Sequence, residues 1–198
     1  MFAGWPWADH AAMSTTHTTS LPLVPGRWKV DTAHSSVGFT IRHLGVAKVR
    51  GRFDRFDADV VIGETLETTS LSATIDVASL DTANADRDAH VLSADILDVA
   101  RRPTLTFVST RITGAGSEFR VEGELTIGDV TRPLVLNVEF GGQQAFPGGA
   151  RHAGFEATAE LRRRDFGIDL AAMPPGSDAL LGNVVKLELD LELLEPEG

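Results

Sequence analysis

The stretch SLDTANADRDAH, residues Ser79–His90, interrupts a chain that otherwise alternates apolar and polar residues. Alternation with a two-residue period is typical of β-strands; it runs up to Leu80 and resumes at Thr104. In between, the polar stretch is followed by apolar residues at near-helical spacing over Val91–Leu97. The sequence therefore predicts a short helical insert, about residues 84–100, in an all-β chain. We expect this insert to help close one end of a curled sheet.

The alternating segments predict about eight long strands. The clearest lies near the end of the chain, where Val185–Leu193 puts aliphatic residues on one face and charged residues on the other. Strands of this length at meander spacing favour a closed barrel or a sandwich. Between Phe53 and Phe56 the apolar positions change parity, which predicts a β-bulge near Asp54–Arg55 that bends the sheet.

Composition excludes several kinds of protein. The 198 residues suit one domain, and 28 acidic against 18 basic residues give a net charge of -10. This charge argues against nucleic acid as a partner and gives no support to docking on anionic lipid through a basic patch. The absence of cysteine excludes disulfides, thiolate metal sites and a cysteine nucleophile. No apolar run reaches the ~20 residues of a transmembrane helix, so no transmembrane segment is predicted.

The beginning of the chain is predicted to be a disordered tail, residues 1–25, ahead of a barrel domain at residues 26–195. The first twenty residues have no Lys or Arg and no long apolar run, so no signal peptide is recognised and we expect a cytoplasmic protein. Whether Met1 or Met13 is the true start stays open.

Small residues are mixed with large ones in the predicted inward rows of the sheet. They are Ala58, Ala73, Gly123, Ala153, Ala157 and Ala159. Such a mixture either leaves an elongated cavity or lets a filled barrel taper, and the sequence does not decide between the two. A cavity lined in this way would suit an apolar chain, because each buried methylene contributes roughly 0.8 kcal/mol.

Six ordered motifs carry a family resemblance. They are Trp28–Ser35, Gly51–Phe53, Ser79–Thr82 with Arg87–His90, Pro103 with Phe107 and Ser109, Gly123–Ile127 and Arg164–Gly167. With these motifs the chain resembles the YceI-like, polyisoprenoid-binding family over roughly Gly26 to Leu194. Six motifs in the same order make coincidence very improbable.

The resemblance implies a lipocalin-like, eight-stranded antiparallel barrel with a small helical insert. It also implies a homodimer and an elongated pocket for an isoprenoid quinone or a related long-chain amphiphile. Many relatives are secreted to the periplasm, and this chain departs from them by lacking a recognisable signal peptide. It also has Ile96 where the family commonly has Phe, a change that would reshape one end of the pocket.

Fifteen apolar side chains are predicted to bind the ligand because they fall on the inward rows, the insert or the motifs. They are Phe39, Ile41, Phe53, Phe56, Val60, Ile75, Leu92, Ile96, Phe107, Leu125, Ile127, Leu136, Val138, Phe155 and Phe166. Their common face is inferred from parity, which slips if the register shifts by one residue.

A second group of predicted site residues is polar and is expected at the barrel mouth. It comprises His34, His43, Asp86, Arg87, Asp88, His90, Arg164 and Asp165. Two roles stay open for the charged part of the insert: a structural network that fixes the insert to the barrel, which we favour, or acid–base chemistry. Asp81 or Asn84 is expected to cap the first helical turn. A metal site formed by histidine with Asp86 or Asp88 is conceivable but is not predicted.

Three hypotheses of function follow. The first, and preferred, is non-enzymatic binding, transport or storage of an isoprenoid quinone, a polyisoprenoid or a similar long-chain lipid, with no cofactor apart from that ligand. The second is an enzyme that acts at the barrel mouth through His90, Asp86 and Asp88. The third is a structural or stress-linked barrel with a fully packed core.

Overall fold

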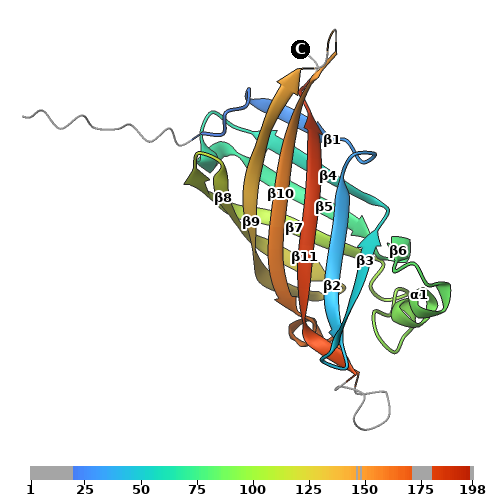
Figure 1. Ribbon diagram of the computed structural model, residues 1–198. Helices are drawn as coiled ribbons and strands as arrows, with labels where there is room; N and C mark the ends of the chain where they lie inside the picture. The colour runs from blue at the N-terminus through green and yellow to red at the C-terminus, as the bar shows by residue number, and fades with distance from the viewer. Residues whose placement is uncertain (1–19, 146, 148, 171–179, 197–198) are drawn as a thin grey trace, which may run out of the picture.

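The computed structural model describes residues 20–145, 147, 149–170 and 180–196. The described part of the chain is mostly β-strand (Figure 1). The strands are β1 Gly26–Val30, β2 Ser36–His43, β3 Ala47–Phe53, β4 Phe56–Ile62, β5 Ser70–Asp76, β6 Leu80–Asp81, β7 Thr104–Ala115, β8 Glu118–Ile127, β9 Val130–Ala145, β10 Arg151–Arg162 and β11 Leu181–Leu194. The helices are α1 Ala85–Leu92 and three 3-10 turns, η1 Leu66–Thr68, η2 Val77–Ser79 and η3 Arg163–Phe166.

Eight strands close an antiparallel barrel, as the sequence predicts. Their order around the ring is β1, β4, β5, β7, β8, β9, β10 and β11, and β1 pairs with β11 through Lys29↔Leu194 and Val30↔Leu193. Closure of this kind leaves few strand edges exposed. The inward and outward residues alternate along β8, whose burial pattern changes at nearly every residue.

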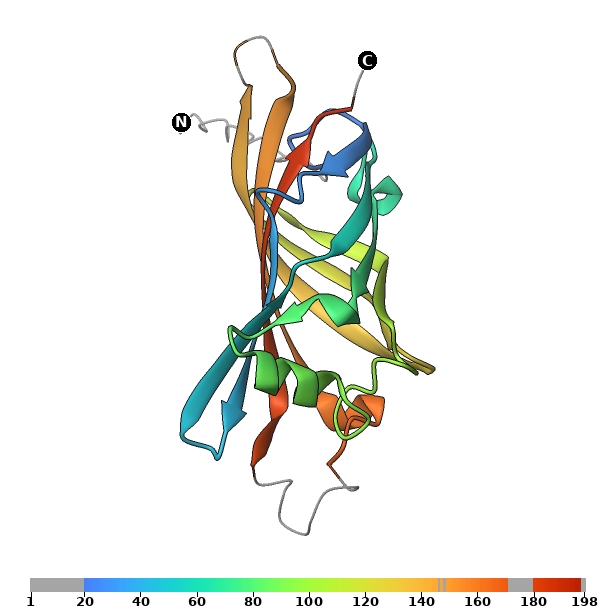
Figure 2. The ribbon, with the colours of Figure 1, turned by 90° about the vertical axis from the view of Figure 1, so that its right-hand side faces the viewer.

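The ring of hydrogen bonds is complete only near β1, at what we call the β1 end of the barrel. Farther along β11, its free edge pairs with β2 in place of β1. Strand β3 pairs with the other edge of β2, and the short β6 pairs with β3. No pairing joins β6 to β5 or β7 within the described strands. Helix α1 and the chain that follows it lie beside this unpaired seam, at what we call the α1 end (Figure 2).

The parity switch at Asp54–Arg55 is a break between two strands. Up to Phe53 the chain pairs with β2, whereas from Phe56 it pairs with β5 and β1. The predicted bend is therefore in the right place, but it transfers the chain from the β2–β3 flap to the closed ring instead of bulging within one strand.

The helical insert is shorter than predicted. Only Ala85–Leu92 is α-helical, because Ser93 is extended and its N–H bonds back to the His90 carbonyl. The remainder, up to Arg102, is a series of turns in which Asp98 has a left-handed φ of 50°. These turns pack Ile96 and Leu97 against the core. No helix among the described residues has the length and apolarity needed to cross a membrane.

Side chains fill the β1 end of the barrel. Trp28 is almost fully buried, and the rings of Phe140 and Phe155 pack with centroids 5.2 Å apart. Residues 20–25, within the tail predicted to be disordered, lie against this cluster with Leu23 buried. Residues 1–19 lie outside the described part of the chain. The described side chains therefore pack into a continuous apolar cluster at the β1 end.

Candidate functional site

An apolar cavity of about 290 Å³ lies at the α1 end, where the ring of strands is unpaired. Its wall comes from β2, β3, β6, α1, the turns after α1, the ends of β7, β8, β10 and β11, and η3 with the residues that follow it. The lining residues are Phe39, Ile41, His43, Val49, Phe53, Leu80, Thr82, Arg87, His90, Val91, Ile96, Leu97, Leu105, Ile127, Leu161, Arg163, Ile168, Leu170, Leu180, Leu181, Val185 and Leu187. Almost all the atoms that face the space are apolar.

The alternation of β2 and β3 creates one side of this wall. Successive side chains of a strand point to opposite faces, so Phe39 and Ile41 turn inward together. Opposite them on β3 lie Gly51 and Val49 in register. Gly51 leaves room for the Phe39 ring, which a Cβ at residue 51 would hit. The Phe39 ring therefore lies over Gly51 and forms part of the cavity wall.

Arg163 is the buried charged residue of the site, with only 2% of its surface exposed. Its guanidinium donates to the carbonyls of Ile168, Leu181 and Gly182 at 2.7, 3.1 and 3.1 Å. Arg163 therefore joins η3 to the start of β11 at the floor of the cavity.

The sequence prediction named Arg164 and Asp165 in place of Arg163. Both are exposed in η3. The signal that identifies Arg163 is parity, since it lies two residues after the inward-facing Leu161 and so continues the same row.

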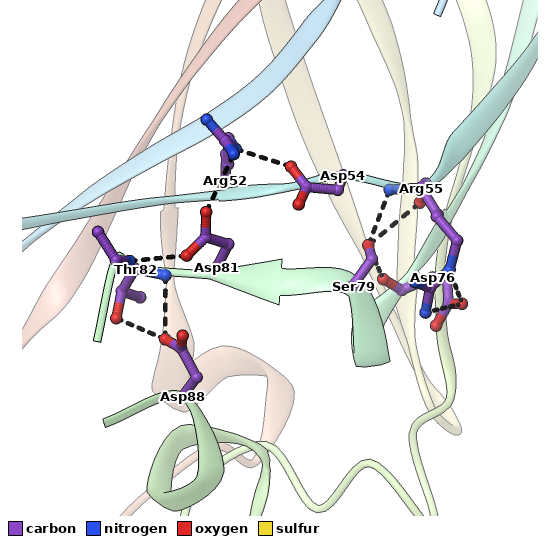
Figure 3. Close-up of polar contacts among 9 residues, drawn as sticks. Arg52, Asp54, Arg55, Asp76, Ser79, Asp81, Thr82 and Asp88 are labelled. Atoms are coloured by element: carbon purple, nitrogen blue, oxygen red, sulfur yellow. Dashed lines mark hydrogen bonds and ion pairs between the residues drawn. The ribbon is translucent and has the colours of Figure 1, made fainter. Parts of the chain in front are cut away.

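Arg87 and Asp88 fix the insert to the sheet, as favoured from the sequence. Thr82 donates its N–H and its hydroxyl to Asp88 Oδ1, the former at 2.9 Å (Figure 3). Arg87 donates from Nε to the Thr82 hydroxyl and from Nη2 to the Thr82 carbonyl, each at 2.7 Å. Asn84 caps the helix by accepting the Arg87 N–H at 2.9 Å. Asp81 does not cap it but accepts from Ala83.

A second network holds the beginning of the same stretch to the β3–β4 corner (Figure 3). Arg52 bridges Asp54 at 2.7 Å and Asp81 at 3.0 Å. On the other side of the corner, Ser79 Oγ donates to the Asp76 carbonyl and accepts from the Arg55 N–H.

The charged partner of Asp76 in this network is Arg55. Its guanidinium contacts the Asp76 carboxylate at 2.9 Å and lowers the pKa of that carboxyl below its ordinary value. The exposed ion pairs contribute little individually, so the corner is held by the set rather than by one pair.

The fifteen apolar residues predicted to bind ligand divide into two groups. Five line the cavity: Phe39, Ile41, Phe53, Ile96 and Ile127. The other ten do not border it and belong to the packed clusters around it: Phe56, Val60, Ile75, Leu92, Phe107, Leu125, Leu136, Val138, Phe155 and Phe166. Many of these residues do face the interior, as predicted. Where side chains fill the barrel, however, an inward-facing residue packs against its neighbours and does not border a cavity.

The polar residues predicted for the mouth are divided between the two ends of the barrel. His43, Arg87 and His90 border the cavity, while Asp86 is exposed in the first turn of α1. His34 lies on the β1–β2 connection, where its Nδ1 is 2.9 Å from Asp31 Oδ2. This hydrogen bond raises the pKa of His34 and lowers the pKa of Asp31.

The one group of potential metal ligands found among the described residues is also remote from the cavity. Asp31, His34 and Glu192 have ligand atoms within 4.8 Å of one another. Their hydrogen bonds are already made within the protein, since Asp31 accepts from Ala33 and Glu192 contacts His152 at 2.6 Å. His90 does not join Asp86 or Asp88 in such a group and instead lies 3.8 Å from Asp95.

Comparison with known sequences identifies the family. The family model described as the YceI-like domain matches residues 28–193. A UPF0312 protein from Vibrio cholerae is 38% identical over 140 residues, which are 70% of this chain and 74% of the relative. A UPF0312 protein from Pseudomonas aeruginosa is 36% identical over 173 residues, which are 86% of this chain and 91% of the relative.

Solved structures show the same barrel. BcnA from Burkholderia cenocepacia superposes with a TM-score of 0.70 at 25% identity, over 82% of this chain and 98% of that one. The YCEI protein from Campylobacter jejuni gives 0.68 at 29% identity, over 84% and 96%. A polyisoprenoid binding domain from Saccharophagus degradans gives 0.61 at 14% identity, over 87% and 100%, and so shares the fold. On the family match and these relatives, the chain belongs to the YceI-like family.

Proposed function

We propose that the protein binds one long-chain amphiphile, an isoprenoid quinone or polyisoprenoid by class, with its apolar tail in the cavity at the α1 end. The observation that carries the proposal is the apolar wall of a cavity of about 290 Å³ at this end of the barrel. The apolar side chains that border this space lack packing partners on one side, and an apolar tail would supply those contacts. The name of the Saccharophagus structure that shares the fold, a polyisoprenoid binding domain, agrees with this class of ligand.

The polar edge of the cavity suits the head of such a ligand. His43 and His90 are exposed residues that border the space, and Arg87 lies beside them on α1. A quinone or hydroxyl head would find hydrogen-bond donors here while its tail lies against Phe39 and Leu187. Few polar groups around an apolar pocket are typical of sites that orient a ligand.

Binding rather than catalysis is part of the proposal. Asp88 accepts two hydrogen bonds from Thr82, and Arg87 is directed to the same residue, so both are engaged in holding α1. Transport or storage of the ligand is the role that we propose for such a binder. The homodimer and the cytoplasmic location stay predictions, to be checked by sedimentation velocity and by cell fractionation.

Two neighbouring valines on β11 provide the decisive variants. Val185 lines the cavity, whereas Val184 points away from it and is 40% exposed. Val185→Trp should fill the space and reduce quinone affinity by at least about tenfold, since the displaced tail loses several methylene contacts. Val184→Trp adds the same side chain outside and should leave the affinity unchanged. Titration calorimetry with a solubilised short-tail quinone measures both.

Native mass spectrometry of the purified protein gives an independent check. We expect a bound lipid in wild-type protein and its depletion in Val185→Trp. Wild-type protein that is always ligand-free and takes up no quinone would refute the proposed function, and equal affinity of both tryptophan variants would place the ligand elsewhere.

A further inference from the structure

The tip of the β2–β3 hairpin, residues 44–47, exposes large apolar side chains. Leu44 is 53% exposed and Val46 is 79% exposed. The turn has left-handed backbone at Leu44 (φ 53°) and Gly45 (φ 72°). That conformation favours Gly or Asn and is unfavourable for leucine. Leucine at this position therefore has both an unfavourable backbone conformation and an exposed apolar side chain, and contact with an apolar phase outside the chain would offset the second cost.

The outward face of the same hairpin is cationic. Segment Ser36–Phe53 contains four Lys or Arg residues and no acid, in a chain whose net charge is -10. Arg42 and Lys48 are direct cross-strand partners. Like charges placed opposite each other are destabilising unless an anion lies between them.

These cations lack acidic neighbours at the tip. The ion pairs of the described residues give no acidic partner to Arg42, Lys48 or Arg50. Arg52, nearer the barrel, is the member of the row that is neutralised, by Asp54 and Asp81. The uncompensated charge is therefore concentrated toward the exposed apolar end of the hairpin.

The hairpin tip borders the mouth of the cavity. His43 and Val49, on either side of it, line the cavity, as does Leu180, which is 39% exposed. Figure 2 shows the β2–β3 hairpin projecting beyond α1 at this end of the molecule. This part of the molecule therefore combines three features. They are an exposed apolar tip on the hairpin, cations on the outward face of the hairpin, and an apolar cavity next to its inward face.

We propose that the β2–β3 hairpin docks on an anionic lipid bilayer, with Leu44 and Val46 in the boundary between head groups and acyl chains and with Arg42, Lys48 and Arg50 at the lipid phosphates. Exposed apolar side chains with Lys or Arg alongside are the features that hold a peripheral protein at such a surface. The acidic remainder of the molecule is repelled, which orients the cavity mouth toward the lipid.

A second copy of the chain fits this surface less well. A two-fold contact uses the same patch on both copies, so it would bring the cations of both hairpins together. Docking goes beyond the proposed function, since a bilayer is bound whether or not the cavity holds a ligand. Docking would also allow a lipid to enter the cavity directly from the bilayer, and that step alone rests on the proposed function.

Vesicle co-sedimentation of the full chain tests the proposal. Vesicles of phosphatidylcholine with phosphatidylglycerol should bind wild-type protein, and vesicles of phosphatidylcholine alone should bind it less. Lys48→Gln should weaken binding about fivefold, since one basic residue near an anionic surface contributes about that much. Val46→Asn should weaken it about tenfold through lost apolar burial. Added salt should weaken binding of the wild type, because screening shortens the reach of the charges.

Matched controls lie elsewhere on the barrel. Lys29→Gln removes the same charge from an exposed residue of β1, and Val108→Asn makes the same change at a residue of β7 that is 53% exposed. Both should bind as the wild type does. Equal losses in control and hairpin variants, or no preference for anionic vesicles, would overturn the proposal.

Two further measurements separate docking from its alternatives. A dimer seen by sedimentation velocity that Val46→Asn dissociates, without vesicle binding, would assign the tip to a second copy and overturn docking on lipid. Uptake of a solubilised quinone in the absence of vesicles should be unchanged in Val46→Asn. If Val46→Asn loses vesicle binding but keeps quinone uptake, the loss is due to the hairpin. If the wild-type protein takes up no quinone, the proposed function of the cavity fails, whatever the result with vesicles.

Discussion

At the scale of single residues, the small inward-facing positions make room for aromatic rings. A Cβ at Gly123 would hit the ring of Phe107, and one at Gly51 would hit the ring of Phe39. The sequence left open whether such positions create a cavity or only let the barrel taper. In the structure the two rings differ: Phe107 lies in the packed core, whereas Phe39 lines the cavity.

Gly51→Ala should therefore act on the site. The new methyl group pushes the Phe39 ring toward the cavity and also meets Thr82 Cγ2 at 2.9 Å. We expect quinone affinity to fall and the free energy of unfolding to drop by about 1–3 kcal/mol, as overpacked cores show. Calorimetric titration and urea denaturation measure the two effects.

Gly154→Ala is the matched control, because a Cβ at that strand residue meets nothing within 4 Å. It should change neither affinity nor stability appreciably. Unchanged affinity in Gly51→Ala as well would mean that the tail does not reach the Phe39 side of the cavity.

The sequence was least informative about which single polar residues border the cavity. His34 and His90 share the motif-based signal, yet only His90 borders the cavity. Likewise Arg163 and Arg164 are neighbours of the same type, and one is buried while the other is exposed. Which of several equivalent side chains reaches the site depends on where the strands close, and a residue's type does not contain that information.

At the scale of elements, α1 is held to the barrel by few interactions. None of its residues is buried, although Val91 and Leu92 pack against a core cluster. Within the described part of the chain, its side chains hydrogen-bond to one residue outside the insert, Thr82 on the chain after β6. An element with few buried contacts opens more readily than the sheet beside it. Because α1 covers the unpaired seam next to the cavity, its opening should control how fast a ligand leaves.

Asp88→Ala tests this attachment. It leaves the N–H of the buried Thr82 without its acceptor, which costs about 1–3 kcal/mol for a buried donor. Amide hydrogen exchange should speed up in α1 but not in β8 or β9, and dissociation of a bound quinone should be faster. Asp86→Ala removes an exposed carboxylate from the same helical turn and should leave both rates nearly unchanged. Exchange that rises equally in both variants would contradict a specific role for the Asp88–Thr82 contact.

The strands were easier to predict from the sequence than the helix. Alternation is a strong signal over long strands such as β11, and the parity switch located the β3–β4 corner. The helix was overextended because Ile96 and Leu97 continue a helical spacing, although Ser93 and the left-handed Asp98 end it. Apolar spacing shows that residues reach a common core, and turns can do this as well as a helix.

At the scale of the whole molecule, the barrel is filled at the β1 end and hollow at the α1 end. Alternation predicted a closed barrel but gave no indication of which part would be filled, since inward rows look alike along their length. The difference comes from closure: β1 and β4 complete the ring around Trp28, while β2, β3 and β6 leave a seam that side chains do not fill. Net charge was similarly uninformative about the hairpin, because an average over the chain conceals a local reversal of sign.

The size of the cavity predicts how affinity depends on tail length. A volume of about 290 Å³ is at the lower end of the range for ligand pockets. At roughly 30 Å³ for each water-sized group, the cavity holds about ten such groups, which is the number of carbon atoms in two isoprene units. Affinity for a series of quinones should rise steeply over the first two units, at roughly 0.8 kcal/mol of gross burial per methylene, and then change little. Calorimetric titration with tails of one, two, three and more units measures the series. A continued rise beyond that point would require the packed cluster of Phe140 and Phe155 to open, and Phe155→Ala should then extend the range of tails that gain affinity.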